Sequence, residues 1–110
     1  MAKYALFFSY TPESLASMVK NPSDRSAAAR QVAEAVGGTL DTYYWMFGEY
    51  DGIAIFEGPD SVTAGAVSIA LASTGALSKV VTTQLFDADD QQALVERAKS
   101  ALTAYTLPTG

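Results

Sequence analysis

The sequence contains no cysteine and no histidine. Without cysteine it has no disulfide, no thiolate nucleophile and no iron–sulfur ligand. Without histidine it lacks a serine–histidine–aspartate triad, an imidazole general base, a proximal haem ligand and an ordinary zinc site. Any chemistry therefore depends on Asp, Glu, Tyr, Lys, Arg or backbone groups, and we expect no metal and no other cofactor.

Basic residues are also scarce. The sequence has seven Lys and Arg residues and twelve Asp and Glu residues, which gives a net charge of -5. The seven are scattered along the chain, whereas a phosphate backbone requires clustered cations, so we expect no nucleic-acid partner. No apolar run approaches the roughly 18 residues of a membrane span, and no charged leader precedes one. We therefore expect no membrane association and a cytoplasmic location.

What is present is a small, apolar chain. Its 110 residues are enough for one domain with one core, predicted over residues 1–110. Hydrophobic residues make up 49% and charged residues only 17%, which indicates an unusually apolar surface for a small monomer. Large apolar surface patches mark interaction sites, so we expect a second copy of this chain to cover part of the surface.

Apolar periodicity and turn residues predict the element order β-α-β-β-α-β followed by a helix. Thr11 before Pro12, and Asp60 or Ser61, are the expected helix N-caps. The predicted strands are residues 3–10, 39–47, 52–57 and 77–86; the predicted helices are a broken helix over 12–20 and 24–36, a helix from 61 to about 74, and a last helix over about 89–105. This is an α+β, ferredoxin-like βαββαβ subunit with an extra C-terminal helix.

The helix from residue 61 is expected to bury one stripe against the sheet. Its apolar and small residues recur at helical spacing, which is typical of a buried face. The predicted buried stripe consists of Val62, Ala66, Ile69, Ala70 and Ser73. In the last helix, the corresponding face consists of Leu94, Ala98, Ala101, Leu102 and Tyr105.

The turn Gly48-Glu49-Tyr50-Asp51 joins two aromatic-rich strands and resembles the Gly-x-Tyr-Asp signature of the GYD-domain family. The resemblance covers roughly residues 3–86, the predicted core of the domain. Its other elements are Arg25 in the first helix, Gly37-Gly38 at the end of that helix, Pro59-Asp60, Gly75, and the Thr-rich last strand that ends in Phe86.

This resemblance implies a subunit of the dimeric α/β-barrel superfamily, in which two sheets close an eight-stranded barrel with the helices outside. The family is defined by sequence and not by a known reaction. The wider superfamily includes cofactor-free monooxygenases, lactone isomerases, haem enzymes and stress-responsive proteins. Several of its activities depend on a histidine in or near the cavity, and these cannot be transferred to a chain without histidine.

Asp51 is the candidate catalytic residue, and two roles are open to it. An aspartate in a turn commonly accepts backbone N–H bonds and holds a hairpin together. If its carboxylate faces an apolar barrel instead, burial raises its pKa and suits it to proton transfer. For Arg25 and Arg30, an ordinary solvated or paired helix charge is favoured over an anion-binding role.

Aromatic side chains around the turn are the candidate ligand-binding residues. They are Tyr10, Tyr43, Tyr44, Trp45 and Tyr50. Strand alternation must divide the aromatics between the two faces of the sheet, and the sequence does not say which face lines the barrel.

Three functions fit these observations. The first is a homo-oligomeric binding or accessory protein that holds a small apolar or aromatic molecule in the barrel cavity. The second is a cofactor-independent monooxygenase or isomerase, with Asp51 transferring the proton and Tyr43 or Tyr44 orienting the substrate. The third is a purely structural oligomer. Whether the chain is an enzyme stays open.

Overall fold

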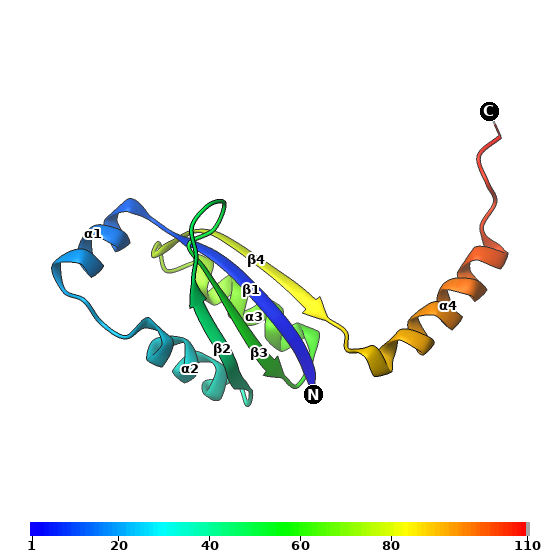
Figure 1. Cartoon of the computed structure of the whole chain (residues 1–110), viewed down its shortest axis with the longest axis horizontal. Coiled ribbons are helices and arrows are strands. Elements are labelled where there is room, and N and C mark those ends of the chain that lie inside the picture. Colours follow the sequence, from blue (N-terminus) through cyan, green and yellow to red (C-terminus); the bar gives the residue numbers. More distant parts are fainter. Residues whose placement is uncertain (110) are drawn as a thin grey trace.

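The computed structural model describes residues 1–109; Gly110, the last residue of the predicted domain, lies outside this range. Its elements follow the predicted order (Figure 1). They are β1 (Ala2–Tyr10), α1 (Pro12–Lys20), α2 (Arg25–Ala35), β2 (Thr39–Trp45), β3 (Gly52–Gly58), α3 (Ser61–Ala72), β4 (Leu77–Leu85), the short 3-10 turn η1 (Ala88–Asp90) and α4 (Gln91–Ala104). The second predicted strand ends earlier than expected, at Trp45, and Phe47 lies exposed in the turn.

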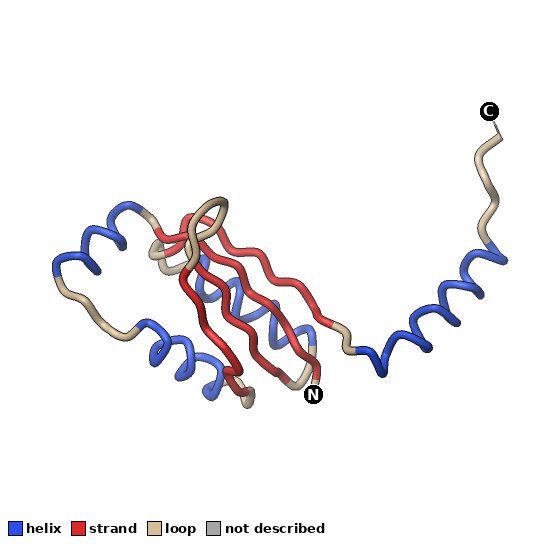
Figure 2. Tube along the Cα trace, in the orientation of Figure 1, coloured by secondary structure: helices blue, strands red, loops and turns tan. Residues whose placement is uncertain are grey.

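The four strands form one antiparallel sheet in the order β2-β3-β1-β4 (Figure 2). The two longest strands, β1 and β4, pair along their length, and β3 lies on the other side of β1. This order confirms the predicted α+β, ferredoxin-like subunit with an extra C-terminal helix.

Local capping explains where the helices begin and end. The Thr11 side chain accepts a hydrogen bond from the Ser14 N–H (3.2 Å), and Asp60 accepts one from the Thr63 N–H (2.8 Å), as predicted for both caps. At the other end of α2, Gly37 has a φ of 81°, which only glycine adopts without strain. Its N–H donates to the Glu34 carbonyl and satisfies the last turn of the helix.

The core lies between the sheet and the two helices α2 and α3, which cover the same face. Tyr4, Leu6 and Phe8 of β1 point to this helix-covered face, together with Ala54 and Phe56 of β3. Ala64 and Val67 of α3 pack against them. The opposite face of the sheet, called the open face below, has no helix over it.

The predicted buried stripe of α3 is wrong. Val62 is 82% exposed and Ile69 is 73% exposed, whereas Ala64 and Val67 are buried. The helix is apolar or small almost all round, so its periodicity does not determine its rotation. Contacts from the sheet determine it instead: Tyr4 and Ser61 share a hydrogen bond, and so do Ser68 and Thr82 of β4.

Helix α4 extends away from the rest of the chain (Figures 1 and 2), and all of its residues are exposed. The radius of gyration is 17.7 Å, whereas a compact chain of this length has about 13 Å. The apolar face predicted for this helix, with Leu94, Leu102 and Tyr105, is therefore left in solvent. Within residues 1–109, no helix is both long enough and apolar enough to cross a membrane.

Candidate functional site

Asp51 lies immediately before β3 and binds the end of β1. Its Oδ2 accepts a hydrogen bond from the Tyr10 N–H at 2.9 Å, and its own N–H donates to the Phe8 carbonyl at 2.9 Å. The Asp51 carbonyl accepts from the Met46 N–H at 2.9 Å. Asp51 thereby joins the ends of three strands, which is the backbone-binding role open to an aspartate in a turn. A catalytic role for Asp51 stays a prediction.

The rest of the turn lies over the open face. The Tyr50 ring packs on the Phe7 ring with centroids 5.4 Å apart. Lys79 Nζ of β4 lies 5.0 Å from the Tyr50 centroid and 3.8 Å from Glu49 Oε1. Gly48 has a φ of 123°, a conformation that other residues resist, so it allows the turn to fold back in this way. The signature turn is therefore held by Asp51 to β1, and by Tyr50 and Glu49 to side chains of the open face.

The structure divides the five aromatic candidates between the two faces of the sheet. Tyr10, Tyr43 and Trp45 lie on the helix-covered face, where the Tyr10 and Tyr43 hydroxyls are 3.0 Å apart and Trp45 stacks on Tyr10 at 5.4 Å. Tyr44 pairs with Ile53 on the open face, the same face as Tyr50. They therefore do not form one binding surface.

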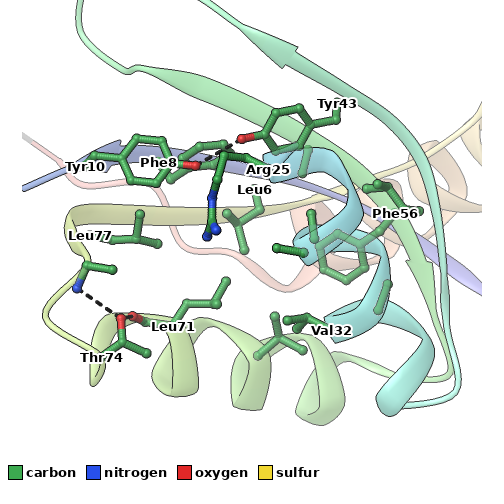
Figure 3. Close-up of a pocket in the computed structure, with 17 residues that line it drawn as sticks. Leu6, Phe8, Tyr10, Arg25, Val32, Tyr43, Phe56, Leu71, Thr74 and Leu77 are labelled. Carbon is green, nitrogen blue, oxygen red and sulfur yellow. Dashed lines mark hydrogen bonds between the residues drawn. The ribbon is translucent and has the colours of Figure 1, made fainter. Parts of the chain in front are cut away.

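A cavity of about 210 Å³ lies between the sheet, α2 and α3 (Figure 3). Its floor is formed by Leu6, Phe8, Ala54 and Phe56, and its helix walls by Ala29, Val32, Val67 and Leu71. This cavity is on the helix-covered face, opposite to the face that would line a barrel. A barrel interior forms only between two sheets, so the barrel cavity stays a prediction.

Few polar groups reach this cavity. They are the Tyr10 and Tyr43 hydroxyls, Thr74 and Arg25, whose side chain points into the cavity (Figure 3). Arg25 Nε is buried and has no hydrogen-bond partner within the described part of the chain. From its sequence neighbours, a solvated or paired role is favoured for Arg25, because its spacing along α2 does not show what lies across from it. The position of the side chain in the cavity is visible only in the folded chain.

Tyr43 is held as the neutral phenol. Burial, followed by the hydrogen bond with Tyr10, raises its pKa well above the usual tyrosine value. Tyr43 therefore keeps its proton at the cavity and contributes hydrogen bonds but no negative charge.

This raised pKa predicts a loss of stability in alkali. The folded state keeps the Tyr43 proton while the unfolded chain releases it near pH 10. The free energy of unfolding should therefore be at its full value below about pH 10 and fall as the pH rises further. Urea unfolding at increasing pH should show a shallower fall for Tyr43→Phe than for the wild type. Tyr105→Phe, at an exposed position on the C-terminal segment, should leave the slope unchanged.

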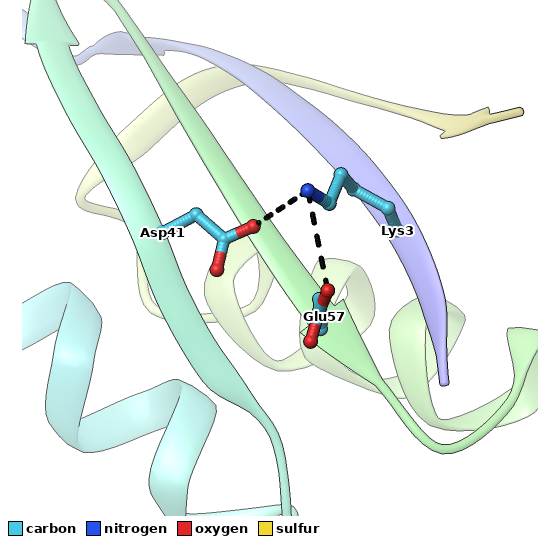
Figure 4. A network of polar contacts seen from close by, with 3 residues as sticks. All are labelled: Lys3, Asp41 and Glu57. Atoms are coloured by element: carbon cyan, nitrogen blue, oxygen red, sulfur yellow. Dashed lines mark ion pairs between the residues drawn. The ribbon is translucent and has the colours of Figure 1, made fainter. Parts of the chain in front are cut away.

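The open face has a polar end and an apolar centre. Lys3 Nζ lies 3.1 Å from Asp41 Oδ2 and 4.0 Å from Glu57 Oε1 (Figure 4). Hydrogen bonding to Asp41 raises the pKa of Lys3. In the centre, Phe7, Ile53 and Val81 are neighbours across three strands. In residues 1–109, no cluster of three or more Asp or Glu side chains has the geometry to hold a metal ion.

The sheet order and the helices on one face define an α+β protein with a ferredoxin-like fold. The sequence model of the GYD domain family matches residues 4–95. The chain therefore belongs to the GYD domain family, as its Gly48-Glu49-Tyr50-Asp51 turn indicated.

Comparison with solved structures finds the crystal structure of FFRP-DM1, with a TM-score of 0.52 and 13% sequence identity. The match covers 78% of this chain and 100% of that chain. At this identity the likeness shows the fold alone. No curated protein matches the sequence significantly.

Proposed function

We propose that this protein is a homo-oligomeric small-molecule-binding protein whose ligand is a small apolar or aromatic molecule. The observation that carries the proposal is the apolar cavity between the sheet, α2 and α3. Ligand sites are typically concave and mostly apolar, with a few polar groups that orient the ligand. The cavity has this composition, and the Tyr10 and Tyr43 hydroxyls are its orienting groups. We therefore assign the ligand to the helix-covered face.

A panel of small phenols and aromatic acids tests this function. A ligand that binds only the folded state at about 100 times its Kd adds about 2.7 kcal/mol to the free energy of unfolding. The melting temperature should rise for a subset of the panel. A melting temperature that no compound changes would argue against a binding function.

The cavity itself is tested by filling it. Ala29 lines the cavity from α2, so Ala29→Phe should occupy the space with a ring and abolish the response to ligands. The melting temperature without ligand should be kept, because the added ring enters empty apolar space. Ala35→Phe is the matched control, since Ala35 is exposed at the end of the same helix. An Ala29→Phe protein that still binds the compounds would place their site elsewhere.

Self-association through the open face is the second part of the proposal. Tyr44 is 62% exposed and Val81 is 39% exposed on this face, beside Phe7 and Ile53. An apolar sheet face of this kind is covered in a stable protein, and a second copy in a two-fold arrangement closes the barrel that the family resemblance implies. The exposed apolar side of α4 offers a further contact in the same assembly.

The oligomeric state tests this part. Val81→Lys introduces a charge into the apolar centre of the open face and should convert the oligomer to monomer in sedimentation velocity. Because Val81 is partly exposed in the single chain, the fold of the monomer should persist. Val19→Lys is the control at an exposed position of α1 and should stay oligomeric. A wild-type protein that sediments as a monomer at micromolar concentration would refute the interface.

A further inference from the structure

The cavity between the sheet, α2 and α3 is lined by one positively charged side chain and by no negatively charged one. Of the residues that line it, Arg25 is the only charged one. The ion pairs within residues 1–109 join Lys3 to Asp41 and Glu57, and Lys79 to Glu49, so Arg25 takes part in none of them. A cation that points into an apolar cavity without a carboxylate partner favours an anion there.

The position of Arg25 in α2 is also electrostatically unfavourable for a cation. Arg25 is the first residue of the helix, where the helix dipole favours negative side chains and disfavours a cation. The neighbouring Asp24 forms no ion pair with Arg25 within residues 1–109; its Oδ1 accepts hydrogen bonds from the Ser26 N–H (3.0 Å) and the Ser26 hydroxyl (2.6 Å). Helix stability therefore does not explain an arginine at this position, whereas an anionic ligand does.

Besides Arg25, the tyrosine pair of the cavity can donate a hydrogen bond to a ligand. In the Tyr10–Tyr43 pair one hydroxyl donates to the other, which leaves the second hydrogen free for a ligand. Arginine has donors only. Thr74 is already occupied, since its hydroxyl donates to the Leu71 carbonyl (2.8 Å) and accepts from the Ala76 N–H (3.1 Å). Free donors beside a cation are complementary to a carboxylate, which has acceptors only.

The size of the cavity limits the apolar part of the ligand. Its volume of about 210 Å³ is below the roughly 300–1,000 Å³ of sites for drug-sized ligands. A single aromatic ring or a short aliphatic chain fits such a volume. Building on the proposed binding function, we infer that the ligand is a small carboxylate with one ring or a short chain. The carboxylate pairs with Arg25 and accepts the one free hydroxyl hydrogen of the Tyr10–Tyr43 pair, and the apolar part lies among Leu6, Val32 and Leu71.

Titration calorimetry with benzoate and benzyl alcohol tests this inference, because the two share a ring and differ in charge at neutral pH. The wild-type protein should bind benzoate about tenfold or more tightly, since a hydrogen-bonded charge pair adds to the shared apolar contact. Arg25→Met keeps a long side chain and removes the charge. It should weaken benzoate binding to the level of benzyl alcohol while binding of the alcohol is kept.

Arg30→Met is the matched control, because Arg30 is exposed on the same helix and does not line the cavity. It should keep the preference for benzoate. Equal affinities in the wild type, or a preference that survives Arg25→Met, would overturn the carboxylate assignment while the binding function stands. Binding of neither compound to the wild type would overturn both. Binding of benzyl alcohol by Arg25→Met also shows that the variant is folded with its cavity intact.

Discussion

Phe8→Ala should lower the free energy of unfolding by about 3–5 kcal/mol, the usual cost of deleting a buried aromatic ring. Phe8 is 4% exposed at the centre of the helix-covered face. Its ring lies 5.5 Å from Tyr10 and 5.7 Å from Tyr43, centroid to centroid. Since small domains are stable by only about 5–15 kcal/mol, much of the fold's stability depends on this ring. Urea unfolding followed by circular dichroism measures the loss.

Phe47→Ala is the matched control for this change. Phe47 lies in the turn and is fully exposed, so its removal should change stability by less than about 0.5 kcal/mol. Comparable losses for the two variants would mean that the buried cluster on the helix-covered face does not provide the stability assigned to it.

Gly52→Ala should destabilise the protein by about 1–3 kcal/mol through overpacking. Gly52 pairs with Phe8 across β1 and β3, and the Phe8 ring occupies the space above it. A Cβ at this position would lie 2.7 Å from Phe8 Cε2 and 3.1 Å from the Tyr44 carbonyl oxygen. Tyr10 and Tyr43 pack against the ring and limit its movement, and the Tyr44 carbonyl belongs to the backbone, which cannot easily move aside. Thermal unfolding of the variant measures the effect.

Gly65→Ala makes the same Gly-to-Ala change but should raise the free energy of unfolding instead of lowering it. A Cβ at Gly65 in α3 has no neighbour within 4 Å, so alanine should stabilise the helix by about 0.5–1 kcal/mol. In the double variant Gly52→Ala/Phe8→Leu, the smaller side chain makes room for the Cβ, and the combined loss should be less than the sum of the two single losses. Strict additivity would show that the ring does not cause the effect at Gly52.

Much of the architecture was predictable from short stretches of sequence. Thr11 and Asp60 cap α1 and α3 as predicted, and Gly37 ends α2. Caps and helix ends depend on backbone hydrogen bonds and φ angles within a few residues, so residue type alone indicates them. The family turn was recognisable for the same reason.

The candidate site was less predictable. Strand alternation predicted that the aromatic residues divide between the two faces of the sheet, but it did not say which residue lies on which face: Tyr10 and Tyr43 meet on the helix-covered face, while Tyr50 packs on Phe7 of the open face. The predicted face of α3 was wrong because its apolar residues surround the helix. The roles of Asp51 and Arg25 depend on groups far away in the sequence: Tyr10 is 41 residues from Asp51, and the cavity around Arg25 includes residues of α3 and of all four strands.

The order of the elements, the helix caps and the membership of the GYD domain family could thus be predicted from the sequence alone, since each depends on neighbouring residues and local backbone geometry. The rotation of α3, the face of the sheet on which each aromatic side chain lies and the cavity that Arg25 enters could not be predicted from the sequence. These features arise when helices and strands from distant parts of the chain pack together, and the burial of each side chain then depends on its non-local neighbours.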